Sequence, residues 1–270
     1  MRSDSTFNNR RMYRIFRGDG RSLVVAMDHG SGLNVYPALA DPTRVLEAVV
    51  AGGADAILTT PGMARQFSHH LKSIGLILRV DGGSSELGSE PDRYQLLYSV
   101  EDALRLGADA VACMGFPGTP HETLTLGNVA ALAGHCQSWG VPLMAEMVPG
   151  GFSNFALHTP ENIRLAVRIG VELGADFVKT EFTGSAESFR PVTENCYRPV
   201  LVLGGSKKDD ERALFMVVKS ALEAGAAGAV IGRNIWGHAH PRAMVMALSQ
   251  MIHRDASVDE ALDVLATTGN

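Results

Sequence analysis

The stretch Glu161–Glu181, ENIRLAVRIGVELGADFVKTE, joins a helix pattern, a glycine and a strand pattern in one piece. Apolar residues recur at helical spacing up to Leu173, which is typical of an amphipathic helix. Gly174 then ends the helix, because glycine adopts the left-handed backbone conformation at little cost. The next run is apolar apart from Lys179 and predicts a buried strand.

The same order recurs along the chain. A helix pattern, a Gly-Ala pair and an apolar run occur four times, with the pair and run at GADAILTT (53–60), GADAVACM (107–114), GADFVKTE (174–181) and GAAGAVIG (225–232). Four further runs of branched and apolar residues alternate with them, namely SLVVAMD (22–28), GLILRVD (75–81), VPLMAEM (141–147) and RPVLVLGG (198–205). All eight are typical of strands that are buried on both faces.

Eight strands that mostly alternate with helices predict an α/β fold, the (β/α)8 TIM barrel. A doubly wound sheet is the alternative, but it normally carries a GxGxxG motif after its first strand. Here the first run ends in MDHG (27–30), without that motif. No linker interrupts the pattern, so we expect one barrel domain over residues 1–270. Residues 1–20 form an N-terminal extension, in which RRMYRIF (10–16) predicts a short amphipathic helix that caps the barrel.

Composition excludes several classes of function. The formal net charge is −5, whereas nucleic-acid binders usually carry a basic face. No apolar run is long enough to cross a bilayer, and the arginine-rich start lacks the apolar segment of a secretory signal, although an organellar transit peptide is an alternative. Three scattered cysteines favour a reduced, cytoplasmic protein. Two histidine pairs lie away from the strand ends, so we expect no metal site.

Ionisable residues gather where the predicted strands end, which is where TIM barrels place their chemistry. Lys179 ends the sixth strand, and a neutral lysine amine can attack a carbonyl to form a Schiff base. The alternative is a structural ion pair with Asp28, Glu146 or Glu181. Asp28 and Glu146 could transfer protons or fix the lysine.

Two further strand-end residues leave their roles open. His29, after the first strand, could act in catalysis or hold its loop through a hydrogen bond. Asp81, after the third, belongs to the site or caps the turn that follows it.

Glycines follow the last two strands together with groups that can donate hydrogen bonds. This is where TIM barrels bind phosphate, although glycines can also serve turns alone. A guanidinium suits a phosphate because its donors form a planar fork. The predicted phosphate-binding residues are Gly204, Gly205, Ser206, Lys207, Gly232 and Arg233.

Four segments together resemble the DhnA/DeoC-type class I aldolases, which include archaeal-type fructose-bisphosphate aldolases, 2-amino-3,7-dideoxy-threo-hept-6-ulosonate (ADH) synthases and LsrF-like thiolases. The segments are VVAMDHG (24–30), GADFVKTEFTGSAESF (174–189), VLVLGGSKK (200–208) and GAVIGRNIWGHAHP (228–241). The resemblance, which covers nearly the whole chain, implies that Lys179 forms the Schiff base beside Asp28 and His29. It also implies that no metal or separate cofactor is needed and that the protein is a homo-oligomer, a pentamer or decamer.

One segment departs from that family. The aldolases carry YPRG at the end of the fifth strand, and its tyrosine is their acid/base group. This chain has VPGG (148–151) at that place and so lacks the tyrosine. The LsrF-like thiolases lack it as well. Val148 cannot transfer a proton, so we hypothesise that Glu146 does. We predict a class I aldolase that acts on a phosphorylated ketose. The alternatives are a thiolase that transfers an acyl group from a phosphorylated dione to coenzyme A, and a non-covalent sugar-phosphate isomerase or sensor.

Overall fold

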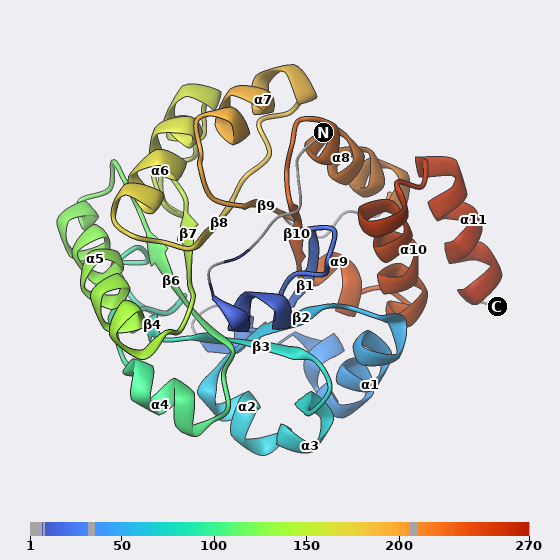
Figure 1. The fold of residues 1–270 in the computed structure, drawn as a ribbon, viewed down its shortest axis with the longest axis horizontal. Coiled ribbons are helices and arrows are strands. Elements are labelled where there is room, and N and C mark those ends of the chain that lie inside the picture. The colour runs from blue at the N-terminus through green and yellow to red at the C-terminus, as the bar shows by residue number, and fades with distance from the viewer. Residues whose placement is uncertain (1–6, 8, 32–35, 206–209, 270) are drawn as a thin grey trace.

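The computed structural model describes residues 7, 9–31, 36–205 and 210–269 and contains a closed barrel of parallel strands inside a ring of helices (Figure 1). The strand order around the barrel is β1-β10-β9-β8-β7-β6-β3-β2. These strands are β1 Ser22–Ala26, β2 Ala56–Thr59, β3 Gly75–Arg79, β6 Ala110–Gly115, β7 Leu143–Met147, β8 Phe177–Thr180, β9 Val200–Leu203 and β10 Gly228–Ile231. Each coincides with one of the eight apolar runs, with β6 extending one residue beyond its run, which confirms the predicted TIM barrel.

The strands are connected mainly by helices on the outside of the barrel. These are α1 Pro42–Gly52, α2 Pro61–Gln66, α3 Ser68–Leu71, α4 Val100–Arg105, α5 Glu122–Trp139, α6 Pro160–Glu172, α7 Ala186–Glu194 and α8 Glu211–Glu223, followed after β10 by α9 Arg233–Trp236, α10 Pro241–Arg254 and α11 Val258–Gly269. A small antiparallel pair, β4 Asp81–Gly82 and β5 Gln95–Leu96, extends from the end of β3 and was not predicted. Among the described residues, no helix has the length and apolar character needed to cross a membrane.

The repeated Gly-Ala signal has a conformational basis. Gly53, Gly107, Gly174 and Gly225 have φ values of 86°, 78°, 105° and 96°. These angles lie in the left-handed region, where a side chain is strained and glycine is not. The glycines therefore end α1, α4, α6 and α8 and turn the chain back toward the next strand, as predicted.

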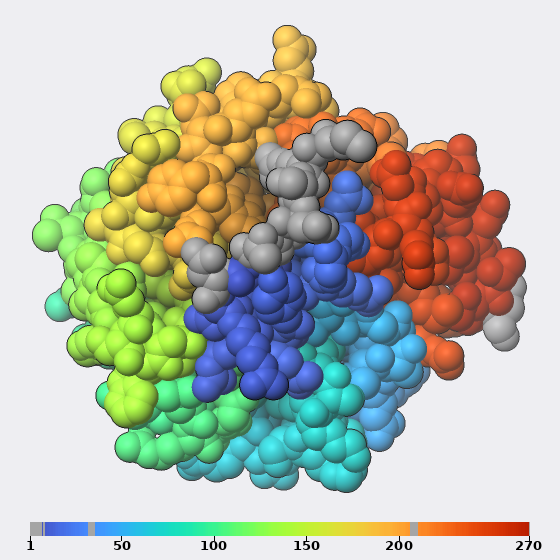
Figure 2. All heavy atoms as spheres, in the orientation of Figure 1, coloured from blue at the N-terminus to red at the C-terminus, as the bar shows by residue number. Residues whose placement is uncertain are grey.

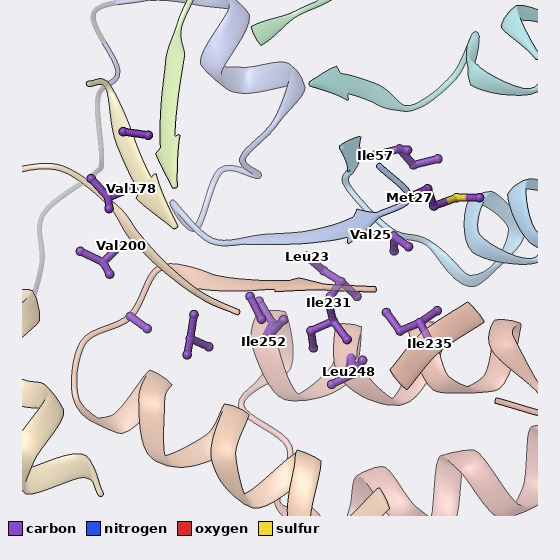
Figure 3. Packing of buried hydrophobic residues seen from close by; sticks show 14 of the residues in the cluster. Leu23, Val25, Met27, Ile57, Val178, Val200, Ile231, Ile235, Leu248 and Ile252 are labelled. Atoms are coloured by element: carbon purple, nitrogen blue, oxygen red, sulfur yellow. The ribbon is translucent and has the colours of Figure 1, made fainter. Parts of the chain in front are cut away.

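Side chains alternate between two apolar layers along each strand. Leu23 and Val25 of β1 and Ile231 of β10 point outward and pack near Leu248 and Ile252 of α10 (Figure 3). The intervening residues point into the barrel, where a second cluster includes Val24, Ala26, Leu58, Ile77 and Phe177. On β8, Val178 belongs to the outer layer and Phe177 to the inner one, so the alternation turns Lys179 inward.

The N-terminal segment closes one end of the barrel. It contains the 3-10 helix η1 (Arg10–Arg14), and its Met12, Ile15 and Phe16 belong to the inner cluster. The Phe16 and Phe177 rings meet edge to face with centroids 5.4 Å apart. The segment, dark blue, crosses the middle of the face in Figures 1 and 2. The predicted capping helix is therefore present in 3-10 form, and the carboxyl ends of the strands face the opposite side.

Candidate active site

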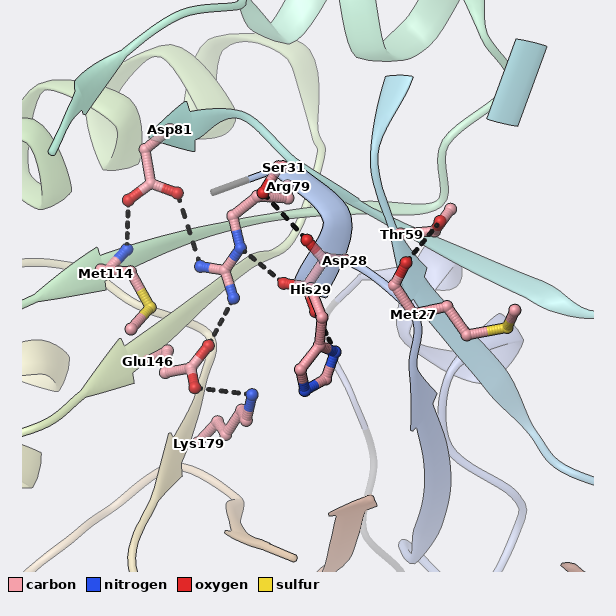
Figure 4. A network of polar contacts seen from close by, with 10 residues as sticks. All are labelled: Met27, Asp28, His29, Ser31, Thr59, Arg79, Asp81, Met114, Glu146 and Lys179. Atoms are coloured by element: carbon pink, nitrogen blue, oxygen red, sulfur yellow. Dashed lines mark hydrogen bonds and ion pairs between the residues drawn. The ribbon is translucent and has the colours of Figure 1, made fainter. Parts of the chain in front are cut away.

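Five charged side chains form one connected group inside the barrel mouth (Figure 4). We call Asp28, Arg79, Asp81, Glu146 and Lys179 the ionic network. Arg79 lies at its centre and donates to Asp28 Oδ2 at 2.9 Å, to Asp81 Oδ1 at 3.4 Å and to Glu146 Oε2 in a short contact. Lys179 Nζ lies 2.6 Å from the other oxygen of Glu146.

Strand register brings the group together. Glu146 of β7 and Lys179 of β8 are paired directly in the sheet, and inward-pointing residues at paired positions lie next to each other. Arg79 is the last residue of β3, while Asp28 lies just beyond the end of β1. The network thus spans the mouth from β1 to β8 at the carboxyl ends of the strands, where TIM barrels carry their active sites.

Burial makes the pairing of these charges essential. Arg79 is 4% exposed, Glu146 6% and Lys179 7%. A charge removed from water is strongly destabilising unless it is paired and hydrogen-bonded. Each cation of the network contacts at least one carboxylate, and Glu146 contacts both cations through separate oxygens. Glu146 is thereby held in a fixed orientation against the lysine amine.

The carboxyl groups of the network differ in their pKa values. Burial raises the pKa of Glu146, but the charges of Lys179 and Arg79 outweigh burial and hold it below its ordinary value. The pKa of Asp28 is lowered in the same way, with Arg79 as the stronger cation. Burial raises the pKa of Asp81 to about 6, against the opposing effect of Arg79. Asp28 and Glu146 are therefore ionised at neutral pH, whereas Asp81 gains or loses its proton about one pH unit below neutrality.

His29 is packed rather than hydrogen-bonded. Its ring lies edge-on to Trp236, with centroids 5.4 Å apart, and its Nδ1 is 3.7 Å from Asp28 Oδ1. Nδ1 is buried and has no hydrogen-bond partner among the described residues. Burial lowers the pKa of His29, which leaves the ring neutral at neutral pH. The predicted loop-holding hydrogen bond is not seen in the described structure, so aromatic packing positions the ring.

The predicted phosphate loops lie side by side after β9 and β10. Arg233 Nη2 donates to the Gly205 carbonyl at 3.3 Å, and Asn234 Nδ2 donates to the Gly204 carbonyl at 2.9 Å. The Nε atom of Arg233 is buried without a hydrogen-bond partner among the described residues. An unpaired buried donor is destabilising and rare in native proteins, so this N–H group is available to a ligand. Ser206 and Lys207 lie outside the described residues.

Glycine is required where the second loop starts. A Cβ atom on Gly232 would lie 2.8 Å from the Ala26 carbonyl and 2.7 Å from Cε1 of His29. Any side chain would therefore collide with both β1 and His29.

Comparison with known protein families agrees with this geometry. Residues 22–238 match the model of the DeoC/LacD family aldolases. The chain belongs to this family. Its members include class I aldolases, which form a Schiff base, so the resemblance deduced from the sequence motifs is confirmed.

Individual relatives of this aldolase-family protein cover nearly its whole length. It is 36% identical over 244 residues to 2-amino-3,7-dideoxy-D-threo-hept-6-ulosonate synthase of Halobacterium salinarum, which covers 90% of this chain and 91% of the relative. It is 32% identical over 267 residues to an uncharacterized aldolase of Saccharolobus solfataricus, covering 94% and 97% of the two chains. An archaeal fructose 1,6-bisphosphate aldolase structure superposes with a TM-score of 0.83 at 30% identity, covering 90% of this chain and 97% of the other.

A second structure of a fructose-1,6-bisphosphate aldolase bears on the chemistry of the family. It holds its catalytic lysine covalently bound to the carbinolamine intermediate of the substrate. It is 30% identical to this aldolase-family protein, with a TM-score of 0.83 and coverage of 90% and 98%. A solved structure similar to this protein therefore uses a covalent lysine intermediate.

The sequence prediction missed Arg79, the centre of the ionic network in this aldolase-family protein. A signal was present, because Arg79 interrupts the apolar run GLILRVD as Lys179 interrupts its own run. The departure at Val148 is also clear in the structure. Val148 is buried in a small cluster with Met114 and Phe116, against which Tyr94 packs. An apolar contact thus occupies the position of the family tyrosine.

Proposed function

We propose that this protein is a class I aldolase that cleaves or forms a C–C bond in a phosphorylated ketose, with Lys179 as the Schiff-base nucleophile. The observation that carries the proposal is the buried contact of 2.6 Å between Lys179 Nζ and Glu146. Arg79 fixes the second oxygen of Glu146. A nucleophile, a proton acceptor and an orienting group in one chain are the arrangement that covalent catalysis requires.

The first step forms the imine. Lys179 passes a proton through Glu146 to solvent, which leaves Glu146 ionised again, and the neutral amine attacks the ketone carbon. The C–N bond forms as the C=O π bond breaks, and Glu146 transfers a proton from the nitrogen to the alkoxide oxygen, which gives a carbinolamine. Loss of water then leaves an iminium, whose positive nitrogen draws electrons from the neighbouring bonds.

The second step breaks the C–C bond. A carboxylate accepts the proton of the substrate hydroxyl that becomes the aldehyde, and the electrons of the C–C bond flow into the iminium to give an enamine. Glu146 and Asp28 are both ionised next to the lysine and are the candidates for this base. Protonation of the enamine carbon and hydrolysis of the imine release the second product, and condensation follows the same path in reverse.

The substrate phosphate binds in this proposal between the loops after β9 and β10. Arg233 supplies the buried, unpartnered Nε and the rest of its guanidinium. Gly204, Gly205 and Gly232 allow the backbone to approach the anion, and Ser206 and Lys207 complete the set of donors. Because β9 adjoins β8, a phosphate there would lie next to the imine formed on Lys179.

The experiment that tests the proposal is a panel of ketose phosphates and diphosphates in an assay for released aldehyde. We expect turnover with at least one member, no detectable turnover for Lys179→Arg, and a loss of about 100-fold or more for Glu146→Gln, which keeps the shape but cannot accept the proton. Turnover by Lys179→Arg would contradict the proposal. The same panel, with a phosphorylated dione and coenzyme A added, tests the alternative, since acyl-coenzyme A would then form in place of aldehyde.

A further inference from the structure

A second pair of ionisable side chains lies at the rim of the barrel mouth. His158 Nδ1 is 2.5 Å from Glu181 Oε2. The other ring nitrogen of His158, Nε2, is 3.1 Å from the backbone carbonyl oxygen of Gly151. The two side chains are 12% and 25% exposed, so the pair is shielded but still partly open to solvent.

These contacts fix the number of protons on the pair. A carbonyl oxygen only accepts hydrogen bonds, so Nε2 of His158 must carry a hydrogen. A neutral ring then has no hydrogen on Nδ1, and an ionised carboxylate has none either. The short contact therefore requires one additional proton, either on Nδ1 or on Glu181. In either form, the pair holds a proton that it can release.

Glu181 lies at the carboxyl end of the strand that carries Lys179. Phe177 and Lys179 point into the barrel, and Glu181 follows Thr180, the last residue of β8, so Glu181 lies two residues beyond Lys179 at the carboxyl end of the same strand. The charge of Glu146 also acts on Glu181, where burial is the main cause of a raised pKa. His158 comes from the connection between β7 and α6, on the side of β8 opposite to β9 and its glycine loop.

The proposed reaction needs a proton donor at this place. The hydroxyl of a carbinolamine leaves as water only after it gains a proton. Asp28 and Glu146 are held ionised, and both oxygens of Glu146 contact cations. Asp81 is 3% exposed, and both of its carboxylate oxygens are engaged, one by Arg79 and the other by the Met114 amide.

We propose that the His158–Glu181 pair is the general acid that protonates the leaving hydroxyl of the carbinolamine on Lys179, an inference that rests on the function proposed above. The proton moves from the pair to the hydroxyl oxygen, the C–O bond breaks, and the nitrogen lone pair forms the C=N bond as water leaves. The pair remains as a neutral imidazole and a carboxylate. It regains its proton from the water that hydrolyses the product imine, which is the same step in reverse.

The test measures the rate of imine formation, by mixing enzyme with a substrate from the ketose phosphate panel and quenching with borohydride at increasing times. We expect Glu181→Gln and His158→Asn each to slow labelling of Lys179 by about 100-fold, within the range of general acid catalysis. The final extent of labelling stays near that of the wild type, because the lysine is intact. Glu187→Gln, which removes an exposed carboxylate of α7, is the matched control and labels at the wild-type rate.

A rescue experiment separates proton transfer from a structural role. In Glu181→Ala, formic acid buffer at fixed pH should accelerate labelling in proportion to its concentration, whereas a structural defect would not respond. Wild-type labelling rates in both pair variants would overturn the inference while leaving the proposed function standing. Absence of label on Lys179 in the wild type with every substrate would instead contradict the proposed function itself.

Discussion

At the scale of single residues, Arg79 holds the active-site carboxylates together. Among the described residues, it is the one cation that contacts all three carboxylates, Asp28, Asp81 and Glu146. Removing one partner from a buried ionic group leaves uncompensated charges in a poorly solvated place, which is more damaging than replacing the whole group. Arg79 is thus a positioning residue whose loss affects stability and the orientation of Glu146 together.

Arg79→Met is therefore expected to lower the free energy of unfolding by about 3–5 kcal/mol, as found when buried pairs are broken. Urea denaturation followed by circular dichroism measures it. Arg105→Met is the control, because Arg105 forms an exposed pair with Asp102 that contributes little. Equal effects of the two substitutions would show that Arg79 is not the centre of a buried network.

Asp81 should give the protein a pH-dependent stability. Its pKa rises from 3.8 to about 6 on folding, so between these values the folded state binds more protons than the unfolded state. Stability therefore falls as pH rises through this window, by up to about 3 kcal/mol for this group alone.

Comparing urea denaturation at pH 4.5 and pH 7 in wild type and Asp81→Asn isolates this contribution. We expect the wild type to lose more stability than the variant between the two values of pH. An identical change in both proteins would contradict the raised pKa.

The sequence located most of the ionic network but not its connections. Asp28, Glu146 and Lys179 were predicted because they end apolar runs, and β strands expose their ends at one side of the barrel. Arg79 was missed because Asp81 was assumed to end the third strand, whereas β3 ends at Arg79. A charged residue inside an apolar run can point to either face, and only the register of the barrel decides which. His158 carries no sequence signal, since it lies in an irregular connection.

At the scale of elements, a buried histidine ties α10 to the start of the barrel. His253, near the end of α10, contacts Asp19 through Nδ1 at 2.8 Å and Asp55 through Nε2 at 2.9 Å. Asp55 also accepts from the Leu23 amide and contacts Arg17. One imidazole thereby joins the last turn of α10 to the segments before β1 and β2.

His253→Ala is expected to lower the free energy of unfolding by about 2–3 kcal/mol, because two hydrogen bonds to charged groups are lost. Thermal or urea unfolding measures the change. His135→Ala, at an exposed position of α5, serves as the control and should change stability little. If His253→Ala left the free energy of unfolding unchanged, the two carboxylates would have found other partners.

Helices and strands were predicted well where the sequence pattern was long enough to recognise. The eight barrel strands follow from apolar runs and the helices before four of them from glycine stops. The β4–β5 pair could not be predicted in this way, because two-residue strands are too short to show an alternation.

At the scale of the whole molecule, the barrel is closed at one end and carries the ionic network at the other. The N-terminal segment fills the base with Met12, Ile15 and Phe16, while the ionic network occupies the mouth. In TIM barrels generally, the carboxyl end of the strands serves catalysis and the opposite end serves stability, and the proposed function follows this division.

Phe16→Ala should test this separation. Loss of a fully packed ring typically lowers stability by about 3–5 kcal/mol, measured by urea unfolding. Because Phe16 lies at the base, aldehyde release per folded molecule should stay near the wild-type rate. Tyr13→Ala is the control, since that ring is 48% exposed. A selective loss of turnover in folded Phe16→Ala would contradict the separation of the two ends.

The most direct test of the central claim is borohydride reduction in the presence of a turned-over ketose phosphate, followed by peptide mass spectrometry. We predict that the peptide containing Lys179 gains the mass of the reduced substrate adduct, and that Lys179→Arg and enzyme without substrate gain none. Cleavage of the substrate without an adduct, or an adduct confined to another lysine, would contradict the assignment of Lys179 as the Schiff-base nucleophile.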